Sequence, residues 1–291
     1  MKQLPFSKMQ GAGNDFVVLD AMKEMPPVDA AFIRRLADRK FGVGCDQVLL
    51  LSPVNNDAEA DFRYRIFNNT GEEIEQCGNG ARCIARFAVL KGYAHGPVIR
   101  LRVRNGIISV TAEADGERMT VDMGAAKLDY ADIPFDPTGF ARRRSGGIMQ
   151  YGLWQEEKGD FLWFSVVNLG NPHAVIFIDG NVADVNLQDL GPRVQNCGHF
   201  PEGVNVSFVE PLSQSQARIR VYERGSGETL ACGTGTCAAF IAGRLQGRFG
   251  PETMFHARGG DLFCRSRTSL ESVMLTGNAS VVFEGFFPIY D

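Results

Sequence analysis

The sequence predicts an α+β protein built from two similar halves, and three observations lead to this prediction. Short runs rich in valine, isoleucine and phenylalanine lie between glycine, proline, asparagine or aspartate residues, which indicates many short strands. Helical periodicity is confined to few segments, so strands and helices do not alternate as they do in βαβ folds. A segment containing Cys-Gly-x-Gly occurs twice, each time directly before a predicted helix.

The predicted strands share β-branched and aromatic residues inside and turn-forming residues at both ends. In chain order they are 15–20, 47–51, 62–67, 98–103, 119–122, 161–167, 174–178, 205–210 and 218–222. The segment 139–159 is interpreted as a loop or a peripheral hairpin. Its three arginines, 142–144, are expected in a solvated loop.

Three helices are predicted from apolar residues at helical spacing and from residues that begin or end helices. They run from an Asp29 cap to about Arg39, from Cys77 to Gly92, and from Cys232 to Gly247. Cys83 and Cys237 lie inside the second and third helices, where a buried core position is expected.

The second and third helices belong to an internal duplication, because residues 65–80 align without a gap with residues 220–235. Matching positions are Arg65 and Arg220, Phe67 and Tyr222, Glu73 and Glu228, and Cys77 and Cys232. Asn14 precedes Cys77 by nearly the same distance as Asn171 precedes Cys232. The shared spacing and element order disfavour a chance match of glycine motifs. We therefore predict two halves, 1–123 together with 278–291, and 124–277.

Composition narrows the class of function. The 291 residues are 44% hydrophobic and 22% charged, with a net charge of -4, which argues against nucleic-acid or membrane partners. No apolar run is long enough for a signal peptide or a membrane span, so a cytoplasmic protein is expected. The seven cysteines are an odd number in a long chain, which argues against a disulfide framework and for thiols.

Cys77 and Cys232 are the candidate reactive thiols, because each stands at a predicted helix start. Unpaired backbone N–H groups and the helix dipole favour a thiolate there. The dipole alone lowers a thiol pKa by about one unit, so a thiolate near neutral pH needs a further cation or hydrogen-bond donor. The glycines after each cysteine let backbone amides approach an anion.

If the halves pack about a pseudo-twofold axis, the two thiols face opposite sides of one substrate carbon. One thiolate then removes the α-proton, and the opposite thiol returns a proton to the other face. The amides at both helix starts would hold the α-carboxylate and stabilise the charge that develops on it. This scheme for stereochemical inversion needs no metal and no cofactor, and the cysteine and histidine spacings do not suit zinc.

At these residues the sequence resembles the diaminopimelate epimerase family over nearly the whole chain. The motifs that carry the resemblance are 6–9 with 11–16, 41–47, 63–68, 77–83, 170–173, 200–205, 222–225 and 227–235. The resemblance implies a curved, mostly antiparallel sheet around a central helix in each half. It also implies the interconversion of LL- and meso-diaminopimelate without a cofactor, in lysine and peptidoglycan precursor synthesis.

The resemblance assigns roles to individual residues. Cys77 and Cys232 match the catalytic acid and base, and His173 and Glu223 match residues that assist the proton transfer. The remaining matches are substrate-binding positions: Asn14, Gln47, Asn68, Gly78, Asn79, Asn171, Asn205, Glu223, Arg224, Gly233 and Thr234. His173 is expected in a turn, and Arg224 is expected on a strand beside Glu223.

Some alternatives stay open. After Asn68 the family usually has x-Asp-Gly-Ser, whereas this chain has Asn69-Thr70-Gly71-Glu72, so a related racemase acting on another amino acid is an alternative. A thiol redox protein is a second alternative, although the chain lacks Cys-x-x-Cys. The expected partner is a small-molecule amino acid, and a homodimer is left open.

Overall fold

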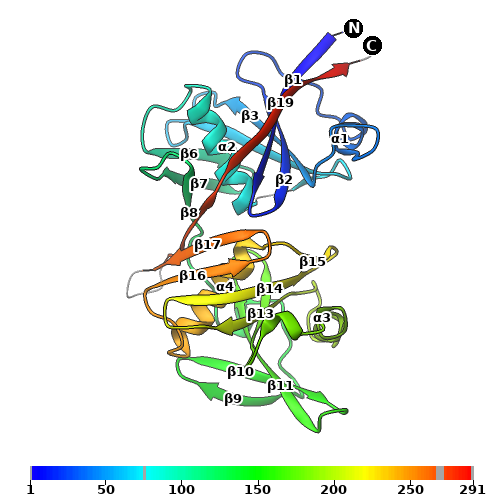
Figure 1. The fold of residues 1–291 in the computed structure, drawn as a ribbon, viewed down its shortest axis with the longest axis vertical. Helices are drawn as coiled ribbons and strands as arrows, with labels where there is room; N and C mark the ends of the chain where they lie inside the picture. The colour runs from blue at the N-terminus through cyan, green and yellow to red at the C-terminus, as the bar shows by residue number, and fades with distance from the viewer. Residues whose placement is uncertain (1, 75–76, 267–271, 290–291) are drawn as a thin grey trace. The chain divides into compact units, whose positions relative to one another are not determined.

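Strands form most of both halves of the computed structural model, which describes residues 2–74, 77–266 and 272–289 (Figure 1). Contacts divide the chain into unit 1, Met1–Asp122 with Thr276–Asp291, and unit 2, Met123–Leu275. The α+β class predicted from the sequence is confirmed. The predicted halves, 1–123 with 278–291 and 124–277, stay a prediction.

The described residues of unit 1 form two helices and ten-residue first and last strands that pair with each other. Its elements are β1 (Lys2–Gly11), β2 (Asn14–Asp20), α1 (Ala30–Ala37), β3 (Gln47–Pro53), β4 (Phe62–Asn68), β5 (Glu73–Ile74), α2 (Gly78–Leu90), β6 (Val98–Val103), β7 (Gly106–Ala112), β8 (Arg118–Asp122) and β19 (Ser280–Ile289). The first and last strands run side by side, since β19 is antiparallel to β1 from Lys2 to Gln10 (Figure 1).

Unit 2 repeats this order and adds a hairpin before it. Its elements are η1 (Tyr130–Asp132), β9 (Ala141–Ser145), β10 (Ile148–Gln155), β11 (Asp160–Asn168), β12 (Pro172–Phe177), η2 (Val182–Asp184), α3 (Leu187–Gln195), β13 (Asn205–Pro211), β14 (Gln216–Glu223), β15 (Gly227–Thr229), α4 (Gly233–Leu245), β16 (Glu252–Ala257) and β17 (Gly260–Arg265). Strand β18 (Met274–Asn278) crosses from unit 2 into unit 1.

The pairings of the strands that surround α2 correspond to those of the strands that surround α4. In unit 1, β2 and β3 are parallel, β3, β4 and β5 are antiparallel, and β4 returns to a parallel pairing with β6. In unit 2, β12 and β13 are parallel, β13, β14 and β15 are antiparallel, and β14 is parallel to β16. The internal duplication seen in the sequence is therefore a duplication of topology.

The central strands β2, β3, β12 and β13 are buried on both faces, which explains why they are almost continuously apolar. Val48–Leu51 of β3 are fully buried. Val48 and Leu50 pack with α1 in one cluster, whereas Leu49 reaches α2, where its side chain lies against Gly80. Because side chains alternate along a strand, odd-numbered residues of β3 face the central helix α2.

The same alternation applies in unit 2. Ala174, Ile176, Val206 and Phe208 pack with α3 in one cluster. Their neighbours along β12 and β13 therefore face the other way, toward α4, where Ser207 contacts Gly235. Helix α4 is buried on nearly its whole circumference, as expected for a helix enclosed by a sheet.

Several sequence predictions need correction. Helix α3 was not predicted, because Gly191 and Pro192 interrupt its pattern; Gly191 is required there, since a methyl group would overlap the ring of Tyr222. The segment 139–159 contains the hairpin of β9 and β10, so the three arginines 142–144 lie on a strand and not in a loop, although they are exposed. No helix in the described part of the chain is long and apolar enough to cross a membrane.

Two equivalent ion pairs hold the hairpins that lead into the central helices. Arg65 on β4 makes two hydrogen bonds to Glu73 on β5, at 2.9 and 2.7 Å. Arg220 on β14 makes two to Glu228, at 2.8 and 3.1 Å. Glu228 also pairs with Arg258 at 3.0 Å. These are the residues that the duplication aligned, so the alignment locates the same interaction in both units.

The two pairs differ in burial, which predicts different stabilities for their variants. The side chains of Arg220 and Glu228 are 16% and 11% exposed, against 24% and 33% for Arg65 and Glu73. Glu228→Gln leaves a buried guanidinium without its counter-charge and should lower the free energy of unfolding by about 3 kcal/mol. Glu73→Gln should cost about 1 kcal/mol. Urea unfolding of both variants checks the order, and an equal loss would contradict it.

Candidate active site

Each of the two central helices begins at a cysteine. Cys77 is the N-cap of α2 and Cys232 the N-cap of α4, both with extended backbone and without a side-chain cap hydrogen bond. The first helical hydrogen bonds run from Ala81 N to Cys77 O at 2.8 Å and from Thr236 N to Cys232 O at 2.9 Å. The amides of the three residues after each cysteine therefore precede the intrahelical ladder and are suited to bind an anion.

The second glycine of each Cys-Gly-x-Gly motif packs directly against the hydroxyl group of a residue on the sheet. A methyl group at Gly80 would overlap the hydroxyl of Tyr64, and one at Gly235 would lie 3.0 Å from Ser207 Oγ. At Gly235 it would also lie 3.4 Å from Cys232 Sγ. At Gly80 only glycine avoids this overlap, whereas at Gly235 a methyl group would make tight contacts that require Ser207 or Cys232 to shift by a few tenths of an ångström.

The predicted site residues of unit 1 lie near the start of α2 on the ends of neighbouring strands. Gln47 begins β3 and Asn68 ends β4; they are paired in register, and Gln47 Nε2 donates to Asn68 Oδ1 at 3.2 Å. Asn79 is buried and accepts from Arg82 at 2.7 Å. Cys77 Sγ donates to Asn14 Oδ1 at 3.7 Å. The structure thus connects Cys77 directly to Asn14 among the predicted residues.

The predicted site residues of unit 2 gather in the same way around α4. His173 and Asn205 are register partners on β12 and β13 and face α4, since their neighbours face α3. Asn205 Oδ1 accepts from the backbone amide of Arg224 at 2.9 Å. Glu223 accepts from Thr229 at 2.6 Å, and Cys232 Sγ lies 3.5 Å from Thr234 Oγ1.

Two local predictions in unit 2 were wrong. His173 does not lie in a turn but on β12, where it is fully buried. Arg224 does not lie on a strand beside Glu223, because β14 ends at Glu223 and Arg224 follows in an exposed turn. Strand β12 begins at Pro172. Proline is tolerated at a first strand position but usually indicates a turn, so the sequence did not show that the strand already includes His173.

Burial sets the electrostatics of unit 2. Burial raises the pKa of the Cys232 thiol well above its usual range, and the negative charge of Glu223 raises it further, while Thr234 acts in the opposite direction. Burial lowers the pKa of His173 to about 3, with a further contribution from the charge of Arg224. Cys232 is therefore a thiol and His173 a neutral imidazole at neutral pH.

The tautomer of His173 follows from its partner. His173 Nε2 lies 2.9 Å from Asn171 Oδ1, an oxygen that only accepts, so Nε2 carries the proton. Nδ1 is then a proton acceptor, and it is buried without a hydrogen-bond partner among the described residues. An unpaired buried acceptor is costly, which marks this atom as a candidate participant in proton transfer.

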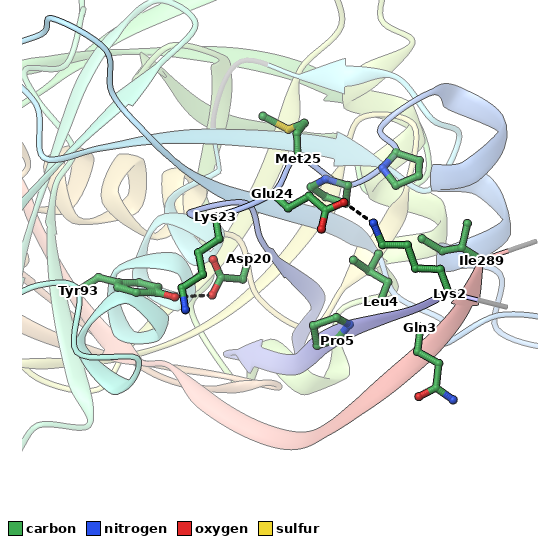
Figure 2. Close-up of a pocket in the computed structure, with 12 residues that line it drawn as sticks. Lys2, Gln3, Leu4, Pro5, Asp20, Lys23, Glu24, Met25, Tyr93 and Ile289 are labelled. Atoms are coloured by element: carbon green, nitrogen blue, oxygen red, sulfur yellow. Dashed lines mark hydrogen bonds and ion pairs between the residues drawn. The ribbon is translucent and has the colours of Figure 1, made fainter. Parts of the chain in front are cut away.

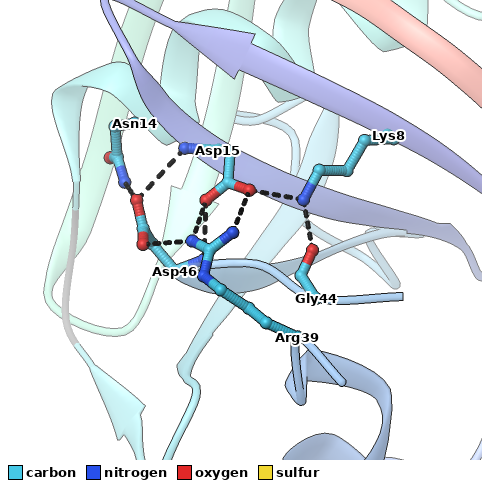
Figure 3. Close-up of polar contacts among 6 residues, drawn as sticks. All are labelled: Lys8, Asn14, Asp15, Arg39, Gly44 and Asp46. Atoms are coloured by element: carbon cyan, nitrogen blue, oxygen red, sulfur yellow. Dashed lines mark hydrogen bonds and ion pairs between the residues drawn. The ribbon is translucent and has the colours of Figure 1, made fainter. Parts of the chain in front are cut away.

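A charged cluster next to Asn14 was missed as a functional feature (Figure 3). Arg39 donates to Asp15 at 3.0 and 2.7 Å and to Asp46 at 2.7 Å. Lys8 pairs with Asp15 at 2.5 Å, and Asp46 Oδ2 accepts from Asn14 Nδ2 at 2.9 Å. The sequence signal for this cluster was an aspartate two residues after a glycine, in Gly13-Asn14-Asp15 and again in Gly44-Cys45-Asp46. Because the charged residues lie far apart in the sequence, the sequence does not reveal that they pair.

A separate pocket of unit 1 contains none of the predicted residues. It has a volume of about 280 Å³ and is lined by the start of β1 and the loop after β2, together with Tyr93 and Ile289 (Figure 2). Four of its polar groups pair with one another, Lys2 with Glu24, and Tyr93 with Asp20 at 2.7 Å. The cysteine-capped helix starts remain the candidate site.

Comparison with known proteins agrees with this site. The sequence model described as diaminopimelate epimerase matches residues 6–128 and 165–282. The chain belongs to the diaminopimelate epimerase family. Both matched segments contain one of the cysteine-capped helices, and the resemblance inferred from the motifs is confirmed.

Curated relatives in this family are similar over almost their full length. A diaminopimelate epimerase of Cupriavidus pinatubonensis is 46% identical over 283 residues, covering 97% of this chain and 96% of the relative. One of Burkholderia thailandensis is 44% identical over 287 residues, covering 97% and 98%.

Solved structures with much lower identity share the fold. A hydroxyproline epimerase from Agrobacterium vitis has a TM-score of 0.65 at 15% identity, covering 98% of this chain and 92% of its own. A PhzF-family phenazine biosynthesis protein from Enterococcus faecalis has a TM-score of 0.67 at 15% identity, covering 99% and 100%. These similarities support the fold class predicted for the diaminopimelate epimerase family.

The low pKa of His173 predicts a specific pH dependence of stability. In the unfolded chain His173 is protonated below a pKa near 6.5, whereas in the folded protein it is protonated only below about pH 3. Stability is therefore lost as pH falls below 6.5, by at most about 1.4 kcal/mol per pH unit from this residue. Between pH 7 and 5, wild type should lose about 2 kcal/mol more than His173→Asn in urea unfolding. The exposed His95→Asn is the matched control, and equal losses in wild type and His173→Asn would refute the assignment.

Proposed function

We propose that this protein interconverts LL- and meso-2,6-diaminopimelate by exchanging the proton on one α-carbon, with Cys77 and Cys232 as acid and base. The observation that carries the proposal is the pair of cysteines at the starts of two equivalent, enclosed helices. Membership of the diaminopimelate epimerase family and the names of its close relatives support the substrate.

The amides at the helix starts supply the site for the α-carboxylate. Gly78 and Asn79 in unit 1, and Gly233 and Thr234 in unit 2, offer backbone N–H groups close to each thiol. A carboxylate bound there meets the positive end of the helix dipole. Negative charge that develops on this carboxylate during proton removal is stabilised by the same donors.

Cys232 must lose its proton before it can act as a base. Burial and the charge of Glu223 favour the thiol in the absence of substrate, so we propose that the substrate ammonium group shifts the balance toward the thiolate. Glu223 is the proposed acceptor of the released proton. Neutral His173, with Nδ1 available, is the second assisting group.

The proton transfer then balances as follows. The Cys232 thiolate takes the α-proton, the C–H bond breaks, and its electron pair is delocalised into the bound carboxylate. The Cys77 S–H bond breaks as its proton forms a new C–H bond on the opposite face. The reverse reaction exchanges the two roles, and residues of the chain supply every group that this scheme uses.

The other predicted residues are proposed to bind the remaining polar groups of the substrate. They are Asn14, Gln47, Asn68, Asn171, Asn205, Glu223 and Arg224. Glu72, where the family usually has a small hydroxyl residue, is exposed near Asn68, whose backbone amide donates to the Glu72 carbonyl at 2.8 Å. If this departure changes specificity, the enzyme is a racemase for another amino acid, which the assay below distinguishes.

The assay is solvent deuterium uptake at the α-carbon of LL-, meso- and DD-diaminopimelate and of a panel of common amino acids. Wild type should label LL- and meso-diaminopimelate and interconvert them. Cys77→Ala and Cys232→Ala should each lower turnover by about 10³-fold or more, because each removes a proton-transfer group. Cys83→Ala is the matched control in the same helix. Full activity of either site variant contradicts the mechanism, and labelling of another amino acid alone contradicts the substrate.

We also propose that the protein is a homodimer and acts in the cytoplasm. Val281, Val282 and Phe286 of β19 are large apolar residues with 41%, 57% and 66% of their surface exposed. Large apolar side chains exposed along one strand are more than a soluble monomer usually presents, and such side chains are typical of association surfaces. Sedimentation velocity should give a dimer for wild type and a monomer for the double variant Val282→Glu, Phe286→Glu. A monomeric wild type contradicts the proposal.

A further inference from the structure

The side-chain amide of Asn14 lies between the Cys77 thiol and a partly exposed charge cluster, in which Lys8 and Asp15 are largely buried and Arg39 and Asp46 are about half exposed. Its Nδ2 donates to Asp46 Oδ2 at 2.9 Å, and its Oδ1 accepts from Cys77 Sγ at 3.7 Å (Figure 3 shows the cluster side). An ionised carboxylate only accepts hydrogen bonds, so the amide must turn its NH₂ group toward Asp46. Its carbonyl oxygen is then the atom left for the thiol.

The Asp46 carboxylate is itself held in place from several directions. Arg39 donates to Asp46 Oδ1 at 2.7 Å and, through two further bonds, to Asp15. The backbone amide of Asp46 donates to Asp15 Oδ1 at 3.0 Å, and that of Asp15 to Asp46 Oδ2 at 3.3 Å. The two aspartates therefore hold each other, with Arg39 bridging them and Lys8 bound to Asp15.

We propose that Asp46, held by Arg39 and Asp15, is a positioning residue that fixes the Asn14 amide so that its carbonyl oxygen, and not its NH₂ group, meets the Cys77 thiol. A carbonyl oxygen hydrogen-bonds to S–H and not to the thiolate, so this orientation favours the protonated form of Cys77. Cys77 is thus protonated before substrate binds and is ready to donate its proton. If the amide were free to turn, its NH₂ group would stabilise the thiolate instead.

Other titratable and charged groups of unit 1 also lie near Cys77, and their charges do not depend on the orientation of the Asn14 amide. Among the residues that the structure describes in unit 1, the titratable and charged groups that interact electrostatically with Cys77 or Cys83, besides the cluster members Lys8, Asp15, Arg39 and Asp46, include Tyr64 and Arg82. Tyr64 and Cys83 are fully buried and have raised pKa values, so both are neutral. The orientation of Asn14 is therefore the property of this environment that Asp46 controls.

The test measures the thiolate fraction of Cys77 directly, as the rate of its alkylation by iodoacetamide against pH, followed by mass spectrometry of the Cys77 peptide. Asp46→Ala should increase this rate at neutral pH by about three- to tenfold and move the profile to lower pH, as a shift of half to one pKa unit would do. In the Asn14→Ala background Asp46→Ala should add no further increase, because Asp46 acts through Asn14.

Asp57→Ala is the matched control, since it removes a carboxylate that pairs with Arg102 in the same unit, at 2.6 and 3.0 Å, without contact to Asn14. It should leave the Cys77 profile unchanged. If Asp46→Ala does not fold by circular dichroism, Arg39→Gln replaces it, and a smaller increase in the same direction is expected. An effect that persists fully in the Asn14→Ala background, or no effect at all, overturns the proposal.

The catalytic meaning of this inference rests on the proposed function, but the experiment does not. Alkylation is measured without substrate, so it reports the Asp46–Asn14–Cys77 relation whichever amino acid the enzyme uses. Failure of the deuterium assay with diaminopimelate would leave the alkylation result intact. Loss of coupling in the alkylation assay would leave the two-cysteine reaction intact.

Discussion

The constraint on which the site depends is the unfinished hydrogen-bonding pattern at the start of an enclosed helix. The first amides of α2 and α4 have no carbonyl partner within the helix, and the surrounding sheet shields them from much of the solvent. A carboxylate or a thiolate is the natural complement of such a group of donors. Glycine after each cysteine keeps the backbone accessible. The hydroxyl of Tyr64 leaves no room for a larger residue at Gly80, and that of Ser207 makes a larger residue at Gly235 tight.

The duplicated scaffold holds two thiols in different surroundings. Cys77 is partly exposed and hydrogen-bonds to an uncharged amide, whereas Cys232 is buried near a carboxylate. The ion pairs Arg65–Glu73 and Arg220–Glu228 are the same in both halves, so the scaffold has kept its symmetry where it supports the loops. The two halves differ in the side chains next to the sulfur atoms, Asn14 beside Cys77 and Thr234 with Glu223 beside Cys232. An acid and a base need unlike environments, and similar backbones supply them through unlike neighbours.

The sequence predicted the strands and helices whose signals are local. The Asp29 cap, the β-branched strands and the two cysteine-led helices follow from short-range rules. The duplication aligned the residues that form the equivalent ion pairs, but the pairing itself is seen only in the structure. Helix α3 was not predicted because Gly191 and Pro192 both have low helix propensity. The glycine is required because a side chain at position 191 would overlap the ring of Tyr222. The burial of His173 and the pairing of Arg39 with two distant aspartates depend on tertiary packing, which a single sequence does not reveal.

The pairing of β1 with β19 joins the two ends of the chain within one unit, and this has a consequence for synthesis on the ribosome. Residues 123–275 emerge before the last strand, so unit 2 is complete while β1 still lacks its neighbour along Lys2–Gln10. During that interval the nascent protein presents a long, unpaired strand edge, the kind of surface that invites wrong pairing with other chains. Unit 1, whose first strands are translated before unit 2, is thus completed only when Ser280–Ile289 has emerged and paired with β1.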